Sequence, residues 1–403
     1  MRPIAEAYVR LVLGVGQHDP AYVDAYYGPP EWRADVENRA ASLADLSIDA
    51  GRLVDEIAHL EPSADVDEGR RGVLGGQMRA VKARIAQLSG QRLSFDEESA
   101  AFYDAVAPTR PESYFQSTLD ELDGLVAGAG PLIERLDRFR AQFIIPTDRL
   151  ADVFDRAIDE CRRRTRDRIS LPDEERFTVE YVSDKPWSGY NWYKGRYQSV
   201  IQVNTDLPVY IDRAIDLAAH EGYPGHHLFN VLLEQQMVEQ RGWIEFTVYP
   251  LFSPVSLIAE GTANFGIEVA FPGDTRLRFD RDVLMPLAGL PVAEADRYDA
   301  VMRLVSRLSY AGNEAARRYL DGAQDRGATI EWLTRFALMS PARAEQRTRF
   351  MDAYRSYVIN YNLGQDMVRD YIEAHGGTAA DPNRRWDLFL ALLQSPRLPS
   401  GLR

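Results

Sequence analysis

Half of the histidines in this chain lie within one run of eight residues. The chain has six histidines, and three of them, His220, His226 and His227, belong to the run HEGYPGHH that begins at His220. Neutral imidazoles bind zinc, and Glu221, directly after the first histidine, can take the proton from an attacking water. The run therefore predicts the centre of a metal-dependent hydrolase.

The spacing of these histidines differs from the common HExxH motif, in which the pair stands at i and i+4 on one helical face. Here Pro224 occupies i+4 and lacks the N–H that would bond to the His220 carbonyl. On a straight helix of about 100° per residue, His227 returns to the face of His220. If Gly225 and the proline widen the turn by about two residues, His226 comes round instead. We favour His226 as the second ligand, with His227 as the alternative ligand or as a residue behind the ligands or at the substrate.

A third ligand is available 40 residues beyond His220, in the segment EGTANFGIE from Glu260 to Glu268. Ser253 and Pro254 predict the start of the helix that carries it. The two glutamates are about 80° apart around that helix, so they need not share a role. Glu260 is the predicted ligand, and Glu268 is predicted to accept the second ring N–H of a ligand histidine.

These segments resemble the motifs of a bacterial family catalogued as domain of unknown function 885. That family carries HExxPGHH, then EGWAxYxE, then a late YxxGQ, and this chain has YNLGQ from Tyr361. The resemblance covers roughly residues 175–370. Thr262, Phe265 and Phe229 depart from the family pattern, and these departures concern substrate preference, because the metal-binding positions are retained.

The family is grouped with the gluzincin-like metallopeptidases. The resemblance therefore implies a mainly α fold, in which a large helical body carries a small β-sheet beside the metal-binding helix. It also implies one Zn²⁺ per chain, held by two histidines and a glutamate. Tyrosine is a suitable donor to the developing oxyanion, and we expect Tyr361 in that role, with Tyr357 and Tyr310 as alternates.

Two segments, residues 176–183 and 197–204, alternate as strands do, and a loop rich in aromatics and glycine, residues 187–196, separates them. The resemblance implies that the edge of such a sheet pairs with an extended substrate, which is a sound way to hold any peptide backbone. We expect the substrate to lie along residues 197–204. The predicted substrate-binding residues are Trp192, Tyr193, Val200, Gln202, Asn204 and, for a substrate carboxylate, Arg369.

The rest of the chain reads as helix, including long amphipathic stretches from Leu74 to Leu88 and from Leu150 to Ile169. A soft boundary near residue 145 separates a helical N-terminal part, 1–145, from the motif-bearing catalytic part, 146–403. We expect the two parts to form one compact unit.

The composition of the chain argues against several classes of partner and of metal site. With 61 acidic and 47 basic residues the net charge is −14, which argues against a nucleic-acid surface. The single cysteine, Cys161, rules out a disulfide within the chain and a cysteine-based zinc site. No apolar run reaches the ~18 residues of a membrane span. The first thirteen residues are interrupted by charges and predict an amphipathic helix rather than a signal peptide. We therefore expect a cytoplasmic enzyme with no membrane partner.

Together these features predict a zinc-dependent peptidase that cleaves short peptides, with Glu221 as the general base. A zinc-dependent amidase of a non-peptide metabolite fits the same residues, because nothing in the motifs identifies the substrate beyond a carbonyl group. A catalytically silent binding protein of the same fold is a further alternative, and the presence of Glu221 argues against it.

Overall fold

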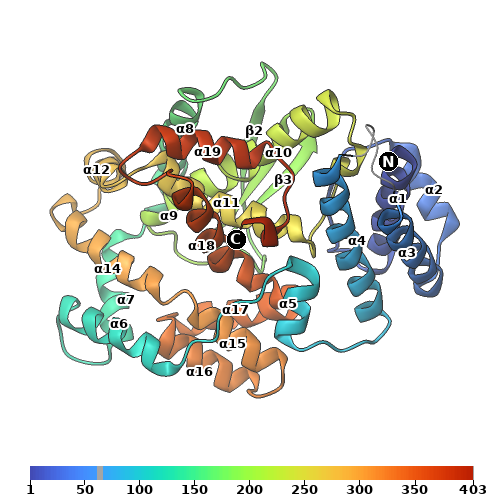
Figure 1. Ribbon diagram of the computed structural model, residues 1–403. Coiled ribbons are helices and arrows are strands. Elements are labelled where there is room, and N and C mark those ends of the chain that lie inside the picture. The colour runs from blue at the N-terminus through green and yellow to red at the C-terminus, as the bar shows by residue number, and fades with distance from the viewer. Residues whose placement is uncertain (61–66, 403) are drawn as a thin grey trace.

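The computed structural model describes residues 1–60 and 67–402, and over these residues the protein is mainly helical with two small β-sheets (Figure 1). The helices before the larger sheet are α1 (Arg2–His18), α2 (Pro30–Arg39), α3 (Leu43–Ala58), α4 (Glu68–Leu88), α5 (Phe95–Tyr103), α6 (Glu112–Leu125), α7 (Leu132–Arg140) and α8 (Leu150–Arg166). The helices after it are α9 (Asp212–Leu217), α10 (His226–Leu233), α11 (Pro254–Ala270), α12 (Thr275–Phe279), α13 (Met285–Ala288), α14 (Ala295–Arg307), α15 (Ala311–Leu320), α16 (Arg326–Phe336), α17 (Pro341–Tyr354), α18 (Ile359–Ala374) and α19 (Pro382–Leu393). The expected mainly helical fold with a small sheet beside the helix of His220 is confirmed.

The helices follow the expected periodicity, and their ends follow local chemistry. In α8 the buried side chains recur at helical spacing, among them Leu150, Val153 and Phe154, so that one face packs on the core. α4 begins earlier than the apolar pattern indicates. Its N-cap is Asp67, whose carboxylate accepts the backbone N–H of Arg70 and so satisfies one of the free donors of the first turn.

The larger sheet has three strands, β2 (Arg176–Val182), β3 (Gly189–Gly195) and β4 (Gln198–Asn204), in the order β2-β4-β3. β4 is parallel to β2 and antiparallel to β3. The two predicted strands are therefore confirmed, but most of the segment predicted as a loop is a third strand. Because β4 is hydrogen-bonded on both sides, it has no free edge. The prediction that a substrate pairs along residues 197–204 is wrong.

The smaller sheet joins the N-terminal part of the chain to the part that carries the sequence motifs. Its strands, β1 (Val23–Tyr26) and β5 (Val248–Pro250), are antiparallel and more than 200 residues apart in sequence. β1 also packs beside β3. The main hydrophobic core contains buried side chains from both sides of residue 145, such as Phe115 and Phe252.

Two glycines allow α11 and α18 to cross in direct backbone contact near the middle of the molecule (Figure 1). A Cβ atom on Gly261 would lie 2.4 Å from the carbonyl carbon and oxygen of Gly364. A Cβ atom on Gly364 would lie 2.6 Å from the carbonyl oxygen of Leu257. Any side chain at either position would force the helices apart. The crossing fixes the second and third sequence motifs relative to each other.

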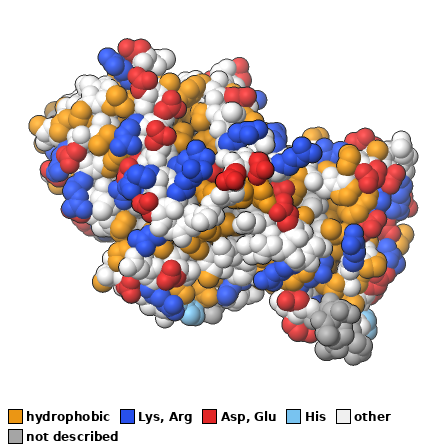
Figure 2. Space-filling model, turned by 90° about the horizontal axis from the view of Figure 1, so that it is seen from above, with side chains coloured by type: hydrophobic (Ala, Val, Ile, Leu, Met, Phe, Trp, Pro, Cys, Tyr) orange, Lys and Arg blue, Asp and Glu red, His pale blue; other side chains and the backbone are white. Residues whose placement is uncertain are grey.

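On the face drawn in Figure 2, acidic and basic side chains are interspersed, as on an ordinary solvated surface. Cys161 is buried. Within the described part of the chain, no helix combines the length and the apolar character that crossing a membrane requires.

Candidate metal centre

His220 lies on a widened helical turn. α9 continues directly into the π-helical turn η3 (Ala218–Gly222). At its end, the N–H of Tyr223 bonds to the carbonyl of Ala218, five residues back, at 3.1 Å. Such wide turns occur frequently at functional sites. The widening that the sequence predicts is confirmed.

Gly225 turns the chain so that His226 faces His220. Its N–H bonds to the carbonyl of Ala219 at 2.9 Å, and a Cβ atom on this glycine would lie only 1.9 Å from the carbonyl oxygen of His220. No other residue fits so close to the preceding backbone. α10 then begins at His226.

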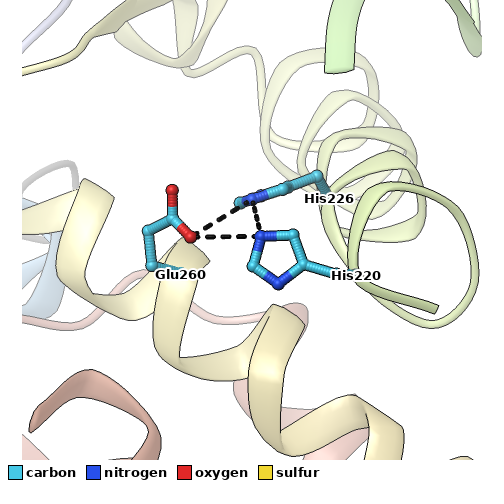
Figure 3. A group of neighbouring side chains, drawn as sticks. All are labelled: His220, His226 and Glu260. Atoms are coloured by element: carbon cyan, nitrogen blue, oxygen red, sulfur yellow. Dashed lines mark hydrogen bonds and ion pairs between the residues drawn. The ribbon is translucent and has the colours of Figure 1, made fainter. Parts of the chain in front are cut away.

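The side chains of His220, His226 and Glu260 point toward one another (Figure 3). The two Nε2 atoms are 3.1 Å apart. Glu260 Oε2 lies 3.2 Å from His220 Nε2 and 3.6 Å from His226 Nε2. Among the residues that the structure describes, these three are the group whose ligand atoms converge closely enough to hold a metal ion.

The donor set fits a zinc ion. Nitrogen and oxygen ligands at about 2.0–2.2 Å in tetrahedral arrangement are about 3.3 Å from one another, and the three observed separations fall around that value. Glu260 Oε2 is buried and has no hydrogen-bond partner among the described residues. A buried carboxylate oxygen needs a partner, and a cation at the point where the three side chains converge would supply one.

Neighbouring groups orient two of the three candidate ligands. His220 Nδ1 lies 2.9 Å from the amide oxygen of Asn264, which places the ring proton on Nδ1 and leaves the Nε2 lone pair for a metal. The Asn264 amide nitrogen donates to the carbonyl of Tyr361 at 2.9 Å. The Tyr357 hydroxyl donates to Glu260 Oε1 at 2.8 Å.

Glu268 does not have the orienting role that the sequence predicts. Its Oε1 accepts hydrogen bonds from Gln365 at 3.0 Å and from Arg369 at 2.6 Å. One turn earlier on the same helix, Asn264 occupies the position beside His220. The prediction for Arg369 also fails, because its guanidinium is paired with Glu268 and with Asp366 and does not line the cavity.

His227 faces away from the other two histidines, so its prediction as an alternative ligand is corrected. Its Nδ1 lies 2.8 Å from the Ser199 hydroxyl, and its Nε2 lies 2.8 Å from Glu175 Oε1. The ring is fully buried, and burial lowers the pKa of its imidazole. Both ring nitrogens are engaged on the sheet side of α10, where the histidine ties α10 to β4.

Glu221 lies beside the three converging side chains in a dry environment. Burial raises the pKa of its carboxyl group to about 7, against the opposing effect of His226. The backbone of Gly189 in β3 packs directly on this carboxylate, since a Cβ atom there would lie 2.9 Å from Glu221 Oε1. The Asn191 amide donates to the Glu221 carbonyl at 2.7 Å. β3 therefore positions the candidate base.

These groups open into a cavity of about 960 Å³, which is within the size range of small-molecule and peptide sites. Residues 187–191, which comprise the start of β3 and the two residues before it, form part of its wall. Because the N–H of Asn204 bonds to the carbonyl of Ser188 at 2.9 Å, the alternate residues Gly189 and Asn191 direct their backbone groups away from β4. The free edge of the sheet at the cavity is thus β3.

The other side chains predicted to bind substrate lie outside the cavity wall. The Trp192 indole donates to the Gln202 amide at 3.0 Å, and the Tyr193 hydroxyl bonds to Glu234. The Asn204 amide is held at 2.9 Å by two backbone carbonyls of the segment before β3. Val200 lies on β4 opposite Trp192. The predictions for Val200, Gln202 and Asn204 are wrong because they assumed that β4 was the edge strand. Those for Trp192 and Tyr193 are wrong because they assumed a loop, whereas both residues lie on β3.

The three candidate tyrosines have different surroundings. Tyr357 is committed to Glu260, and the Tyr310 hydroxyl donates to Asp366 at 2.6 Å. Tyr361 lines the cavity, and its ring stacks on His220 with 6.4 Å between centroids. Burial, then the charge of Glu260, raises the pKa of the Tyr361 hydroxyl well above its usual value, so the group stays protonated.

Sequence reasoning missed Asp24, which lies on β1 and lines the cavity. Its carboxylate accepts a hydrogen bond from the Tyr190 hydroxyl, and burial raises the pKa of Asp24 to about 6. Nothing near residue 24 resembles a functional motif, because this residue reaches the cavity only through the pairing of β1 with β5.

No family model matches the chain, and no curated protein matches it. The structure is similar to the crystal structure of a candidate lipoprotein from Colwellia psychrerythraea, with a TM-score of 0.53 and 15% identity, covering 92% of this chain and 70% of that chain. Lower TM-scores relate it to a candidate lipoprotein of unknown function from Shewanella oneidensis (0.44, 12% identity, 90% of this chain and 76% of that chain) and to metallocarboxypeptidase 1 of Trypanosoma cruzi (0.42, 12% identity, 98% of this chain and 91% of that chain). The likeness to the Colwellia protein shows a shared fold.

Proposed function

We propose that this chain is a zinc-dependent hydrolase that cleaves an amide bond in short peptides. The observation that carries the proposal is the convergence of the ligand atoms of His220, His226 and Glu260 beside Glu221. One of these atoms, Glu260 Oε2, is buried without a hydrogen-bond partner among the described residues. The resemblance of the sequence motifs to the family of domain of unknown function 885 supports the same activity.

A zinc ion held by the three side chains would supply a Lewis acid for the substrate carbonyl and lower the pKa of water toward ~7. Glu221 then has the role of general base, because its carboxylate lines the cavity directly beside the three converging side chains, within reach of a water at the metal. It takes the proton of the attacking water and delivers it to the departing amine nitrogen. β3 keeps the carboxylate in place through the close contact at Gly189.

Tyr361 is the proposed donor to the oxyanion. Its hydroxyl stays protonated in the buried wall of the cavity, and its ring lies beside His220. A donor fixed before the reaction stabilises developing charge without reorganisation, which is the most effective form of electrostatic catalysis.

The size of the cavity and the free edge of β3 support a short, extended peptide as the substrate. Backbone groups of Gly189 and Asn191 can pair with a peptide as an added strand, in place of the pairing along β4 that the sequence suggested. The helices that surround the cavity leave room for an oligopeptide rather than for a folded protein.

The deciding experiment is metal analysis of the full chain, purified without added zinc, by inductively coupled plasma mass spectrometry. We expect close to one zinc per chain, and strongly reduced zinc in His220→Ala and Glu260→Ala. His59→Ala is the matched control, because this exposed histidine caps the end of α3, where its Nδ1 bonds to the backbone carbonyl of Asp55. Full zinc occupancy in both site variants would refute the proposed ligand set. Product analysis with a peptide library and with small non-peptide amides then separates a peptidase from an amidase of metabolites.

A further inference from the structure

Arginines of two kinds line the cavity. There are six of them: Arg213, Arg276, Arg303, Arg343, Arg347 and Arg385. Four are paired with carboxylates, at distances of 3.2 Å for Arg213–Asp216, 2.8 Å for Arg276–Asp216, 2.7 Å for Arg303–Asp299 and 2.7 Å for Arg385–Glu373. Within residues 1–60 and 67–402, neither Arg343 nor Arg347 has a carboxylate within ion-pair distance.

The two unpaired arginines lie four residues apart on α17 and therefore share one face of the helix. The Arg347 guanidinium lies over the rings of Phe350 and Tyr361, at 4.7 and 5.7 Å from their centroids. Its Nε is buried and has no acceptor among the described residues. The tyrosine ring in turn stacks on His220, so the free guanidinium lies close to the candidate metal centre.

The surroundings of Arg343 and Arg347 disfavour the positive charges of the two guanidinium groups. Burial lowers the pKa of Arg347. Burial and then the like charges of Arg213 and Arg140 lower the pKa of Arg343. A cation kept in such a place without a counter-ion destabilises the fold, and arrangements of this kind are concentrated at binding sites. An anion supplied by a ligand would remove the penalty.

We propose that Arg347, supported by Arg343, binds the C-terminal carboxylate of the substrate, so that cleavage takes place near the C-terminus of a peptide. A guanidinium presents two parallel N–H donors that match the two oxygens of a carboxylate. From the Arg347 guanidinium to the Tyr361 ring is 5.7 Å, and from that ring to His220 is 6.4 Å. Extended chain spans about 3.3–3.6 Å per residue, so the carboxylate lies at most roughly three to four residues from His220.

This inference rests on the proposed function only for the position of the scissile bond, and its test therefore measures binding. The experiment uses the full chain with the substitution Glu221→Gln, which prevents turnover of the peptides. This variant is mixed with N-acetyl-Gly-Gly-Xaa peptides, in which Xaa is every amino acid, once as free acids and once as C-terminal amides. Retention is measured by ultrafiltration and mass spectrometry. We expect the acids to be retained at least tenfold more strongly than the amides.

Variants on α17 assign the effect. Arg347→Met should remove the preference for acids, by a factor of roughly 10–100 in affinity, since a hydrogen-bonded charge is lost. Arg347→Lys keeps the charge but loses the paired donors, and should retain part of the preference. Arg349→Met is the matched control: Arg349 is exposed on the same helix and paired with Glu345, and its loss should change nothing. Circular dichroism checks the fold of each variant.

Equal retention of acids and amides, or a preference that persists in Arg347→Met, overturns the proposal. Retention of only those amides in which Xaa is Asp or Glu also overturns it, because the anion would then be a side chain. The binding test and the proposed function can also give different answers. If the acids are preferred through Arg347 but the protein with intact Glu221 hydrolyses none of them, the carboxylate site stands and the proposed hydrolase is refuted.

Discussion

The imidazole of His220 is held in one tautomer by the side chain of Asn264. The Nδ1–Oδ1 distance is 2.9 Å, and the amide cannot be turned round without loss, because its nitrogen donates to the Tyr361 carbonyl. One amide group thus connects a candidate metal ligand on η3 to the backbone of α18. Orienting contacts of this type raise the basicity of the ligand and fix its direction.

Replacing Asn264 with Leu should weaken zinc binding by roughly 10–100-fold, because the His220 ring loses its orienting acceptor. Competition with a fluorescent chelator measures the change. Glu268→Gln is the control, because Glu268 bonds to Gln365 and Arg369 and not to a histidine. If the Glu268 variant loses zinc and the Asn264 variant keeps it, the orienting role belongs to the glutamate after all.

Glu221→Gln should retain zinc while turnover of peptides falls by roughly 10²–10⁴-fold, because the amide cannot accept the proton. Metal content and kcat are measured on the same preparation. Turnover close to that of the wild type would place the general base elsewhere in the cavity, with Asp24 the first carboxylate to test.

Gly189→Ala should lower kcat without loss of zinc. The new methyl group would lie 2.6 Å from Leu217 Cδ2 and 2.9 Å from Glu221 Oε1, so that the carboxylate or the strand must move. A displacement of about 1 Å at a reacting group can reduce the rate by about 10²-fold. Gly51→Ala is the control, because this glycine in α3 has open space around it. Unchanged kcat in Gly189→Ala would show that β3 does not position Glu221.

His227→Ala should reduce stability and leave zinc binding nearly intact. The substitution removes the buried imidazole that bonds to Glu175, and loss of a hydrogen bond to a charged group typically destabilises by about 1.5–3 kcal/mol. Thermal unfolding and zinc content, measured together, test this expectation. A stable variant that has lost its zinc would restore His227 as a ligand.

Gly261→Ala and Gly364→Ala should each destabilise the protein by about 1–3 kcal/mol or more, because a methyl group would be forced into the backbone of the opposite helix. The midpoint of chemical unfolding gives the change. Gly312→Ala, in α15 with open space around it, should be neutral or slightly stabilising. A neutral effect at position 261 would mean that α11 and α18 can separate freely.

The sequence predicts those parts of the site that depend on neighbouring residues. The widened turn follows from Pro224 and Gly225, which act on the helix that contains them. The position of β4 in the sheet could not be predicted, because it depends on pairing with β3, whose glycines and aromatic residues are typical of a loop. Asn264 was missed for a similar reason, since only the crossing of α11 with η3 shows which side chain meets His220.

Residues from distant segments were beyond sequence reasoning altogether. Asp24 reaches the cavity through a strand pair that spans the chain. Arg347 and Arg343 differ from the four other cavity arginines in having no carboxylate within ion-pair distance among the described residues. In a chain with 47 basic residues, that difference is visible only in three dimensions. The sequence instead drew attention to Arg369, which the fold neutralises.

The glycine contact between α11 and α18 has a practical consequence for redesign. Because backbone meets backbone at that crossing, the spacing between Glu260 and Tyr361 is set by main-chain atoms rather than by any choice of side chain. α14 contributes only walls to the cavity. A protein engineer can therefore exchange residues on this outer helix to admit new substrates, while the reactive groups keep their mutual geometry.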